Sequence, residues 1–299
     1  MATPTISGND VRCVLKWDAI VGESPLWHPR ERRLYWVDIQ GKKVHRFDPK
    51  NGWNETFELP EIVTCLAFRK EGGLLLTLRK AFAFFDPDFG KLEMLTEVEA
   101  GNAHTRFNDG RVDPQGRFWA GTMGDPAWDK PVGSLYRFDP NQTVTQMCTQ
   151  VICSNGTAWS PGGGTMYYTE SFRYAIYAFD FDSTTGSLAN RRTFAEIERD
   201  LGAFPDGLCV DAEGFVWSNQ VGVGRVVRYD PAGRIERQIQ LPVPRAVACT
   251  FGGDNLCTLF ITSARETMTT RQLQEAPLSG SIFAVEPGVA GQAATAFGG

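Results

Sequence analysis

The chain has 299 residues, long enough for one large domain or two ordinary ones, and 30 Lys and Arg against 35 Asp and Glu give a net charge of −5. This balance, without a run of five like charges, argues against nucleic acid as a partner. No stretch approaches ~18 consecutive apolar residues and the N-terminus lacks a signal-peptide pattern, so we expect neither a membrane span nor export.

The cysteines also indicate a protein that is not exported. The seven cysteines are scattered along the chain and form no C-x-x-C pair. An odd, scattered set of this kind favours reduced thiols over a disulfide framework. The sequence therefore predicts a cytoplasmic protein.

The first predicted strand is "VRCVLKW" at 11–17, and six similar units follow it. The third apolar run of each unit ends on an aromatic or aliphatic pair and an acid: "HRFDP" at 45–49, "AFFDP" at 83–87, "YRFDP" at 136–140, "AFDFD" at 178–182, "VRYDP" at 227–231 and "FAVEP" at 283–287. Two further short apolar runs separated by a turn precede each ending, which is typical of successive antiparallel hairpins. Apart from 194–201, no segment has a useful helical period.

Units of this length favour an all-β fold: a six-bladed β-propeller with four-stranded antiparallel blades, formed by residues 1–299 as a single domain. A large sandwich or barrel is the alternative, because it also gives many short strands. The strand at 11–17 is expected to pair with the last blade and close the ring, which would remove the open sheet edges.

Alignment of the six units places a polar residue repeatedly at one position, four residues before the first apolar run ends. The six residues at this position are Glu23, Thr64, Asn108, Asn155, Asp206 and Val247. In a propeller the first strand of each blade lines the central channel, so these positions are expected to form a ring around the axis. Asn-Asp-Gly, Ser-Asn-Gly and Pro-Asp-Gly are also good turn formers, so each copy alone could merely begin a strand.

Three members of the ring have the chemistry of a cation site. Glu23, Asn155 and Asp206 supply two carboxylates and an amide oxygen, which suit a hard divalent cation. Three protein ligands would leave positions open for water and substrate. The cation could be calcium, zinc, manganese, magnesium or ferrous iron.

The segment "TMGDPAWDKPVG" at 122–133 is longer than the corresponding segment of another blade and could cover the channel mouth as a lid. It would bring Asp125 and Trp128 to a substrate, although an ordinary surface loop is an equal alternative. Arg106 shares a strand face with Asn108 and could bind an oxygen-rich substrate, with a surface ion pair as the alternative.

Several motifs in combination resemble the SMP-30/gluconolactonase/regucalcin family. They are "GESPLWHP" at 22–29, "RFNDGRVDPQGRFWAGTM" at 106–123, "SNGTAWSP" at 154–161, "PDGLCVDAEGFVW" at 205–217 and "CTFGGDN" at 249–255. The resemblance covers essentially the whole chain and implies a six-bladed sugar lactonase that depends on one divalent cation. It implies Glu23, Asn155 and Asp206 as metal ligands, Arg106 and Asn108 as the substrate-binding pair, and Asp206 as general base.

Two departures from the family pattern concern the choice of substrate. Ala158 stands where animal regucalcins have an Asp, and "MGDPAWDK" replaces an acidic stretch. We expect hydrolysis of a gluconolactone-like aldonolactone, with Asp206 or a hydroxide on the cation supplying the nucleophile. The alternatives are a phosphotriesterase or fluorophosphatase and a non-catalytic calcium-binding regulator. The expected state is a monomer or weak homodimer whose partner is a small sugar lactone, with no nucleic-acid or membrane partner.

Overall fold

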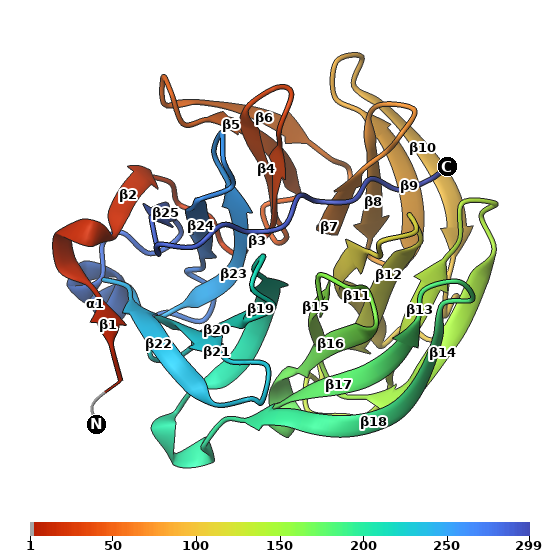
Figure 1. Cartoon of the computed structure of the whole chain (residues 1–299). Coiled ribbons are helices and arrows are strands. Elements are labelled where there is room, and N and C mark those ends of the chain that lie inside the picture. Colours follow the sequence, from red (N-terminus) through yellow and green to blue (C-terminus); the bar gives the residue numbers. More distant parts are fainter. Residues whose placement is uncertain (1–2) are drawn as a thin grey trace.

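Six β-sheets stand around a central axis in the computed structural model, which describes residues 3–299 (Figure 1). The predicted six-bladed propeller with four-stranded antiparallel blades is confirmed. Within 3–299, no helix is long and apolar enough to cross a membrane.

Each blade is an up-and-down meander from the axis to the rim. The first strands are β3 (Gly22–His28), β7 (Val63–Phe68), β11 (Thr105–Val112), β15 (Ser154–Trp159), β19 (Phe204–Val210) and β23 (Ala246–Gly252). The second strands are β4 (Arg33–Asp38), β8 (Leu74–Leu78), β12 (Phe118–Gly124), β16 (Thr165–Glu170), β20 (Val216–Val221) and β24 (Thr258–Ser263). The third strands are β5 (Lys43–Asp48), β9 (Ala81–Asp86), β13 (Gly133–Phe138), β17 (Ala175–Asp182), β21 (Arg225–Tyr229) and β25 (Ile282–Val285). The outermost strands are β6 (Trp53–Glu58), β10 (Lys91–Glu97), β14 (Val144–Val151), β18 (Ser187–Glu196), β22 (Ile235–Gln240) and, in the sixth blade, β2 (Arg12–Leu15).

The ring closes through the N-terminal strand. β2 pairs antiparallel with β25, as predicted for 11–17, so the last blade is completed by the start of the chain. The first strands contact one another all the way round the axis, including β23 with β3. An additional strand that the sequence did not predict, β1 (Thr5–Ile6), extends the fifth blade in parallel with β22.

The acids that end the third strands have a local role. Asp48 Oδ1 accepts the backbone N–H of Lys50 over 2.9 Å, and Asp230 Oδ1 accepts that of Ala232 over 2.9 Å. Such side chains stabilise the turn that leads to the fourth strand. Asp86 makes the same contact with the backbone N–H of Asp88 over 3.0 Å, so in these three blades the acid after the aromatic pair is explained by the hairpin.

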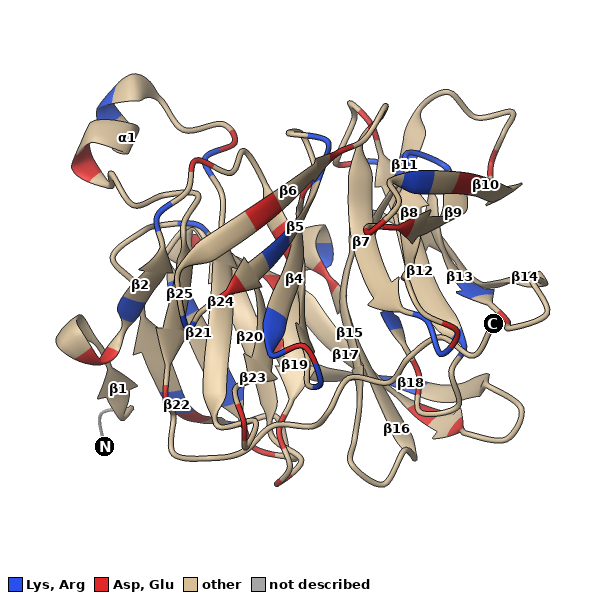
Figure 2. Ribbon diagram, turned by 90° about the horizontal axis from the view of Figure 1, so that it is seen from above, with Lys and Arg blue, Asp and Glu red and all other residues tan. Residues whose placement is uncertain are grey.

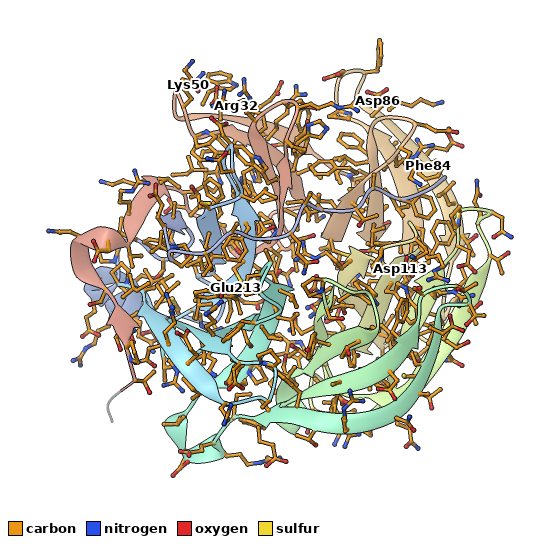
Figure 3. All side chains as sticks on the ribbon, in the orientation of Figure 1. Arg32, Lys50, Phe84, Asp86, Asp113 and Glu213 are labelled. Carbon is orange, nitrogen blue, oxygen red and sulfur yellow. The ribbon has the colours of Figure 1, made fainter. Side chains whose placement is uncertain are left out.

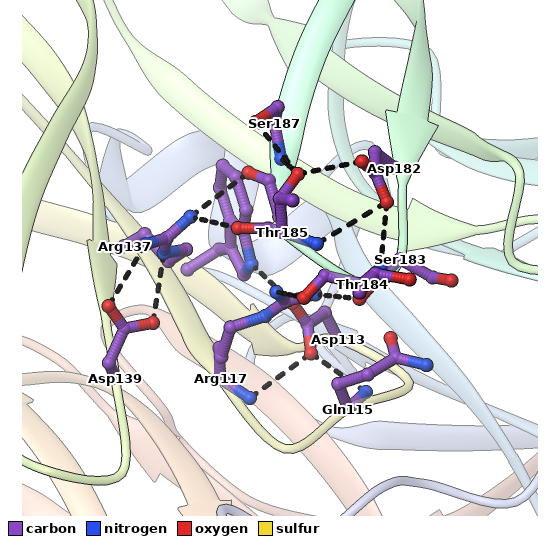
Figure 4. Close-up of polar contacts among 12 residues, drawn as sticks. Asp113, Gln115, Arg117, Arg137, Asp139, Asp182, Ser183, Thr184, Thr185 and Ser187 are labelled. Carbon is purple, nitrogen blue, oxygen red and sulfur yellow. Dashed lines mark hydrogen bonds and ion pairs between the residues drawn. The ribbon is translucent and has the colours of Figure 1, made fainter.

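A second repeated acid anchors a buried tryptophan in each of two blades. Asp113 Oδ2 accepts the indole N–H of Trp119 over 3.0 Å and Arg117 Nε over 2.5 Å. Arg117 reaches on to the carbonyl of Ser183 in the next blade, which Figure 4 shows in close-up. Asp211 binds Trp217 in the same way over 2.9 Å. The echo between "VDPQGRFW" and "VDAEGFVW" is thus architectural.

Apolar side chains fill the space between neighbouring sheets, while Arg32 and Lys50 lie at the periphery (Figure 3). Trp36, Trp119 and Trp217 are fully buried in second strands. All seven cysteines are free, and the Sγ atoms of Cys209 and Cys249 lie 3.6 Å apart.

The two ends of the channel differ. At one end the C-terminal segment crosses the turns between first and second strands, where Phe297 N donates to Phe68 O over 2.7 Å and Gly298 N to Gly116 O over 2.9 Å. At the other end lies the helix α1 (Thr270–Glu275), which the sequence did not predict. Figure 2 shows α1 at the upper end of the propeller and the C-terminal segment crossing its lower half. The segment 194–201 forms the end of β18 and a single 3₁₀ turn, Arg199–Leu201.

Candidate active site

All six innermost strands carry a β-bulge at the same level of the channel. In β11, Asn108 and Asp109 together oppose Gly121 of β12, because the pairing shifts between Phe107 and Gly110. The pairing shifts likewise after Glu23, Val63, Asn155, Pro205 and Ala246. A bulge adds one residue and re-aims the side chains beside it. The channel ring is therefore built on six repeated irregularities of the sheets.

The Asn-Asp-Gly, Ser-Asn-Gly and Pro-Asp-Gly motifs all lie within strands and not in turns. Their glycines allow close approach of neighbouring backbones. A Cβ on Gly156 would lie 2.5 Å from Leu208 N and 2.7 Å from the carbonyl oxygen of Asp206. The inner strands of neighbouring blades can therefore approach at this level only with glycine there.

The bulges surround a cavity that opens at the α1 end of the channel, with a volume of about 80 Å³ available to the centres of water molecules. Five of the six predicted ring positions line it: Glu23, Asn108, Asn155, Asp206 and Val247. Thr64 does not, because its hydroxyl is bonded to Thr77 Oγ1 over 2.7 Å. Arg106 and Trp128 also line the cavity, with walls formed by apolar residues such as Phe172, Phe204 and Val221.

Two of the three predicted metal ligands, Asn155 and Asp206, have a buried acceptor atom without a hydrogen-bond partner. The side-chain amide of Asn155 donates its N–H to Ser171 Oγ over 3.0 Å, so the amide nitrogen is already occupied. The amide oxygen, Oδ1, has no hydrogen-bond partner. Asp206 Oδ1 is buried and unpaired as well. Buried oxygen atoms in folded proteins rarely lack a hydrogen-bond partner. A divalent cation would satisfy both, so the residues present fit such an ion.

Within 3–299, no three His, Cys, Asp or Glu side chains gather into a metal-binding group. The amide oxygen of Asn155 is therefore needed beside the carboxylates of Glu23 and Asp206 to complete a set of three ligands. This composition is oxygen only, which favours hard cations.

A further acid, Asp109, was missed by the sequence reasoning. It is buried, and Gly110 N donates to its Oδ1 over 2.7 Å. Burial raises the pKa of Glu23 and of Asp206 well above the usual range, and the negative charge of Asp109 raises both further. Asp109 belongs to the β-bulge of β11 and does not line the cavity, so it acts on Glu23 and Asp206 through its charge.

These pKa shifts predict how the stability of the metal-free protein depends on pH. The folded state holds protons on Glu23 and Asp206 at a pH where the unfolded chain, in which these carboxyls have pKa values of about 4, has lost them. Stability should therefore fall as the pH rises above about 4. Thermal melting of chelator-treated protein between pH 5 and 8 should show this slope, and Glu23→Gln should reduce it. Saturating calcium should remove it, because a cation favours the ionised carboxylates. An equal slope in wild type and variant would contradict the prediction.

The predicted substrate-binding pair forms one hydrogen-bonded unit. Arg106 Nη1 donates to Asn108 Oδ1 over 2.9 Å and to the carbonyl of Phe107 over 2.8 Å. Asn108 Nδ2 in turn donates to Ser154 O over 2.8 Å, which fixes the amide against the next blade. Burial lowers the pKa of Arg106, and no carboxylate of residues 3–299 forms an ion pair with its guanidinium. The alternative that Arg106 forms a surface ion pair is wrong, because this side chain is buried.

The predicted lid is shorter than expected. Residues 122–124 continue β12, which ends at Gly124, so only 125–132 form the connection to β13. Trp128 lines the cavity. Asp125 does not: it forms an ion pair with Arg79 instead.

The longest connection at the cavity mouth is 264–281, between β24 and β25, and it carries α1. Glu266 of this connection and Arg245, just before β23, line the cavity, and sequence reasoning had missed both. A capping box marks the start of α1, with Thr269 N donating to Gln272 Oε1 over 2.9 Å. The spacing of Thr269 and Gln272 was the signal that could have revealed this helix.

Comparison with known proteins gives consistent matches over nearly the whole chain. The model of the family described as SMP-30/Gluconolactonase/LRE-like region matches residues 21–265. A 6-deoxy-6-sulfogluconolactonase of Pseudomonas putida is 39% identical over 289 residues, which are 97% of this chain and 99% of that protein. A regucalcin of Xenopus laevis is 36% identical over 300 residues, with 98% and 100% covered. A calcium-binding regucalcin of Agrobacterium tumefaciens has the same fold, with a TM-score of 0.94 at 24% identity over 99% of each chain.

Proposed function

The chain belongs to the SMP-30/gluconolactonase family, and we propose that it hydrolyses a sugar lactone to the open aldonic acid with the help of one divalent cation. The observation that carries this proposal is the pair of buried, unpaired oxygens on Asn155 and Asp206 beside the Arg106–Asn108 unit. One side of the cavity suits a cation and the other suits an oxygen-rich substrate. The 6-deoxy-6-sulfogluconolactonase relative supports a lactone as substrate.

Glu23, Asn155 and Asp206 would hold the cation, which when bound supplies a Lewis acid for a carbonyl oxygen. Arg106 is fixed by its bonds to Phe107 O and Asn108, so the remaining N–H donors of its guanidinium can bind substrate oxygens without reorganisation. Trp128 and the apolar walls would cover the sugar ring and exclude water.

Asp206 is the residue of this site best suited to accept a proton. It would take the proton from a water whose oxygen forms a bond to the lactone carbonyl carbon. The bond between that carbon and the ring oxygen then breaks, and the ring oxygen receives the proton. One water is consumed, and a carboxylic acid and a hydroxyl group are formed.

A non-catalytic calcium-binding role is the second candidate, because relatives named regucalcin match nearly the whole chain. That role predicts tight calcium binding without turnover of any lactone. The open mouth of the cavity and the unpaired guanidinium of Arg106 favour a bound small molecule, and thus the lactonase.

The proposed function is tested with chelator-treated protein. Each cation (calcium, zinc, manganese, magnesium or ferrous iron) is restored separately, and hydrolysis is measured for a panel of aldonolactones and for an aryl phosphotriester. We expect lactone hydrolysis that disappears on chelation and returns with at least one cation. Undiminished hydrolysis in metal-free protein would contradict the role of the cation. Preference for the phosphotriester, or cation binding without any turnover, would contradict the lactonase.

A further inference from the structure

Arg245 lies at the cavity mouth, and its side chain has no acidic partner in the part of the chain that the structure describes. It immediately precedes β23 and its side chain is half-buried. Its guanidinium donates to Thr267 Oγ1 over 2.5 Å, and no carboxylate of residues 3–299 lies within ion-pair distance. Other arginines near the mouth are neutralised: Arg79 pairs with Asp125, and Arg265 with Asp18 over 2.7 Å. Arg245 therefore presents a charge that the protein does not compensate by direct contact.

The charge of the whole cavity is consistent with this observation. The charged side chains that line it are Glu23, Arg106, Asp206, Arg245 and Glu266. A divalent cation held by Glu23 and Asp206 would cancel those two carboxylates. Two arginines against the single carboxylate of Glu266 would then leave one net positive charge on the lining side chains, although the chain as a whole carries −5. Asp109 does not line the cavity, and the positive charge of Arg111 acts on it. A cavity of positive charge inside an acidic protein attracts an anionic ligand.

The Arg245 guanidinium and the proposed cation site lie at different depths in the cavity. Glu23, Asn155 and Asp206 are buried on the inner strands, whereas Arg245 is half-buried at the mouth. A lactone whose carbonyl lies at the deep end would direct its exocyclic end toward the mouth. A guanidinium has five N–H donors in a planar fork, and the Thr267 bond uses one of them. This fork matches two oxygens of a carboxylate, phosphate or sulfonate.

We propose that the preferred substrate is an aldonolactone whose exocyclic end carries an oxyanion, and that Arg245 binds that oxyanion. This inference rests on the proposed lactonase function, and it adds a binding residue and a charge class of substrate. Glu266, whose Oε1 accepts Gln40 Nε2 over 3.3 Å, stands on the same connection as Thr267 and would repel an anion placed away from Arg245. The two residues together would fix where the oxyanion lies.

The test compares lactones that differ only at the exocyclic end: the 6-phosphorylated, 6-sulfonated and uronic forms against neutral gluconolactone. For the wild-type protein, kcat/KM should be higher for at least one anionic lactone. In Arg245→Gln the ratio of anionic to neutral kcat/KM should fall about 10- to 100-fold, mainly through KM, because a charge-assisted hydrogen bond is lost. Arg245→Lys, which keeps the charge but not the fork, should retain part of the preference. The arms for phosphate, sulfonate and carboxylate identify which oxyanion is bound.

Arg265→Gln is the matched control, because it removes a nearby charge that does not line the cavity. It should leave the ratio unchanged. An equal loss for neutral and anionic lactones in Arg245→Gln would show that Arg245 only supports the 264–281 connection, and would overturn the inference. The same holds if the wild-type protein shows no preference for an anion.

A binding measurement separates this inference from the proposed function. Isothermal titration compares 6-phosphogluconate and 6-sulfogluconate with gluconate, which share the carboxylate end and differ in the charge at the other. Tighter binding of either anion, lost in Arg245→Gln and weakened by salt, would support the inference even if no lactone is hydrolysed. Equal affinities for all three would overturn it even if lactonase activity is present.

Discussion

Asp206→Ala is expected to lower kcat/KM for lactone hydrolysis by about 10²- to 10⁴-fold in protein with the cation restored, because it removes a proposed ligand and the proposed proton acceptor together. The fold should persist. Asp206 is buried with an unpaired Oδ1, and burial raises the pKa of its carboxyl. This side chain therefore lowers the free energy of unfolding of the metal-free protein. The metal-free variant should therefore melt at the same temperature as metal-free wild type or above it.

Two variants distinguish the roles that Asp206 combines. Asp206→Asn keeps an oxygen ligand but cannot take a proton, so it should retain more cation affinity than activity. Asn155→Ala removes the amide oxygen and should reduce cation affinity, measured by titration calorimetry, with activity recovering at high cation concentration. Activity of Asp206→Ala within tenfold of wild type would contradict the assigned roles.

Asp211→Ala is expected to destabilise the protein by about 3–5 kcal/mol, because it leaves a buried indole without its acceptor and removes the fully buried member of the three carboxylates that bind Arg228. Asp211 Oδ2 accepts Arg228 Nε over 2.9 Å and Trp217 Nε1 over 2.9 Å, and the Arg228 side chain is 2% exposed. Asp211 Oδ1 also accepts the backbone N–H of Glu213 and of Phe215, each over 3.0 Å, so the β19–β20 turn loses its anchor as well. Denaturant unfolding followed by tryptophan fluorescence measures the loss.

The matched control is Asp180→Ala, which removes an acid from an exposed pair. Asp180 lies 2.8 Å from Arg192, and both side chains are about half exposed. Exposed pairs contribute little, so the unfolding midpoint should hardly move. Asp113→Ala should behave like Asp211→Ala, because Asp113 binds Trp119 and Arg117 in the corresponding turn. A midpoint for Asp211→Ala equal to that of the exposed variant would contradict this account of the repeated motif.

The fold could be predicted because its signals are local and repeated. In several blades the acid at the end of the third strand forms its turn with a residue two positions away, as Asp48, Asp86 and Asp230 do, and such short-range chemistry is visible in sequence. The spacing of six such endings determined the number of blades. The same spacing identified ring positions from which Glu23, Asn155 and Asp206 reach one cavity.

The orientation of side chains in that ring depended on tertiary structure. The β-bulge at Asn108 and Asp109 exists only through pairing with β12, so the sequence alone could not show that Asn108 lines the cavity while the buried Asp109 does not. Gly156 is required by the approach of Leu208 from the next blade, a contact that no local pattern contains.

By itself, the sequence determined the architecture, the family resemblance and the chemical types gathered at the channel, because these depend on periodicity and on residue identity. Only the tertiary structure decided which charges meet at the mouth. It paired Asp125 with Arg79 and so took that acid from the cavity wall, and it brought Arg245 and Thr267 together from separate connections. The physical reason is that a cavity between six blades is lined by segments far apart in the chain, whose relative positions follow from packing.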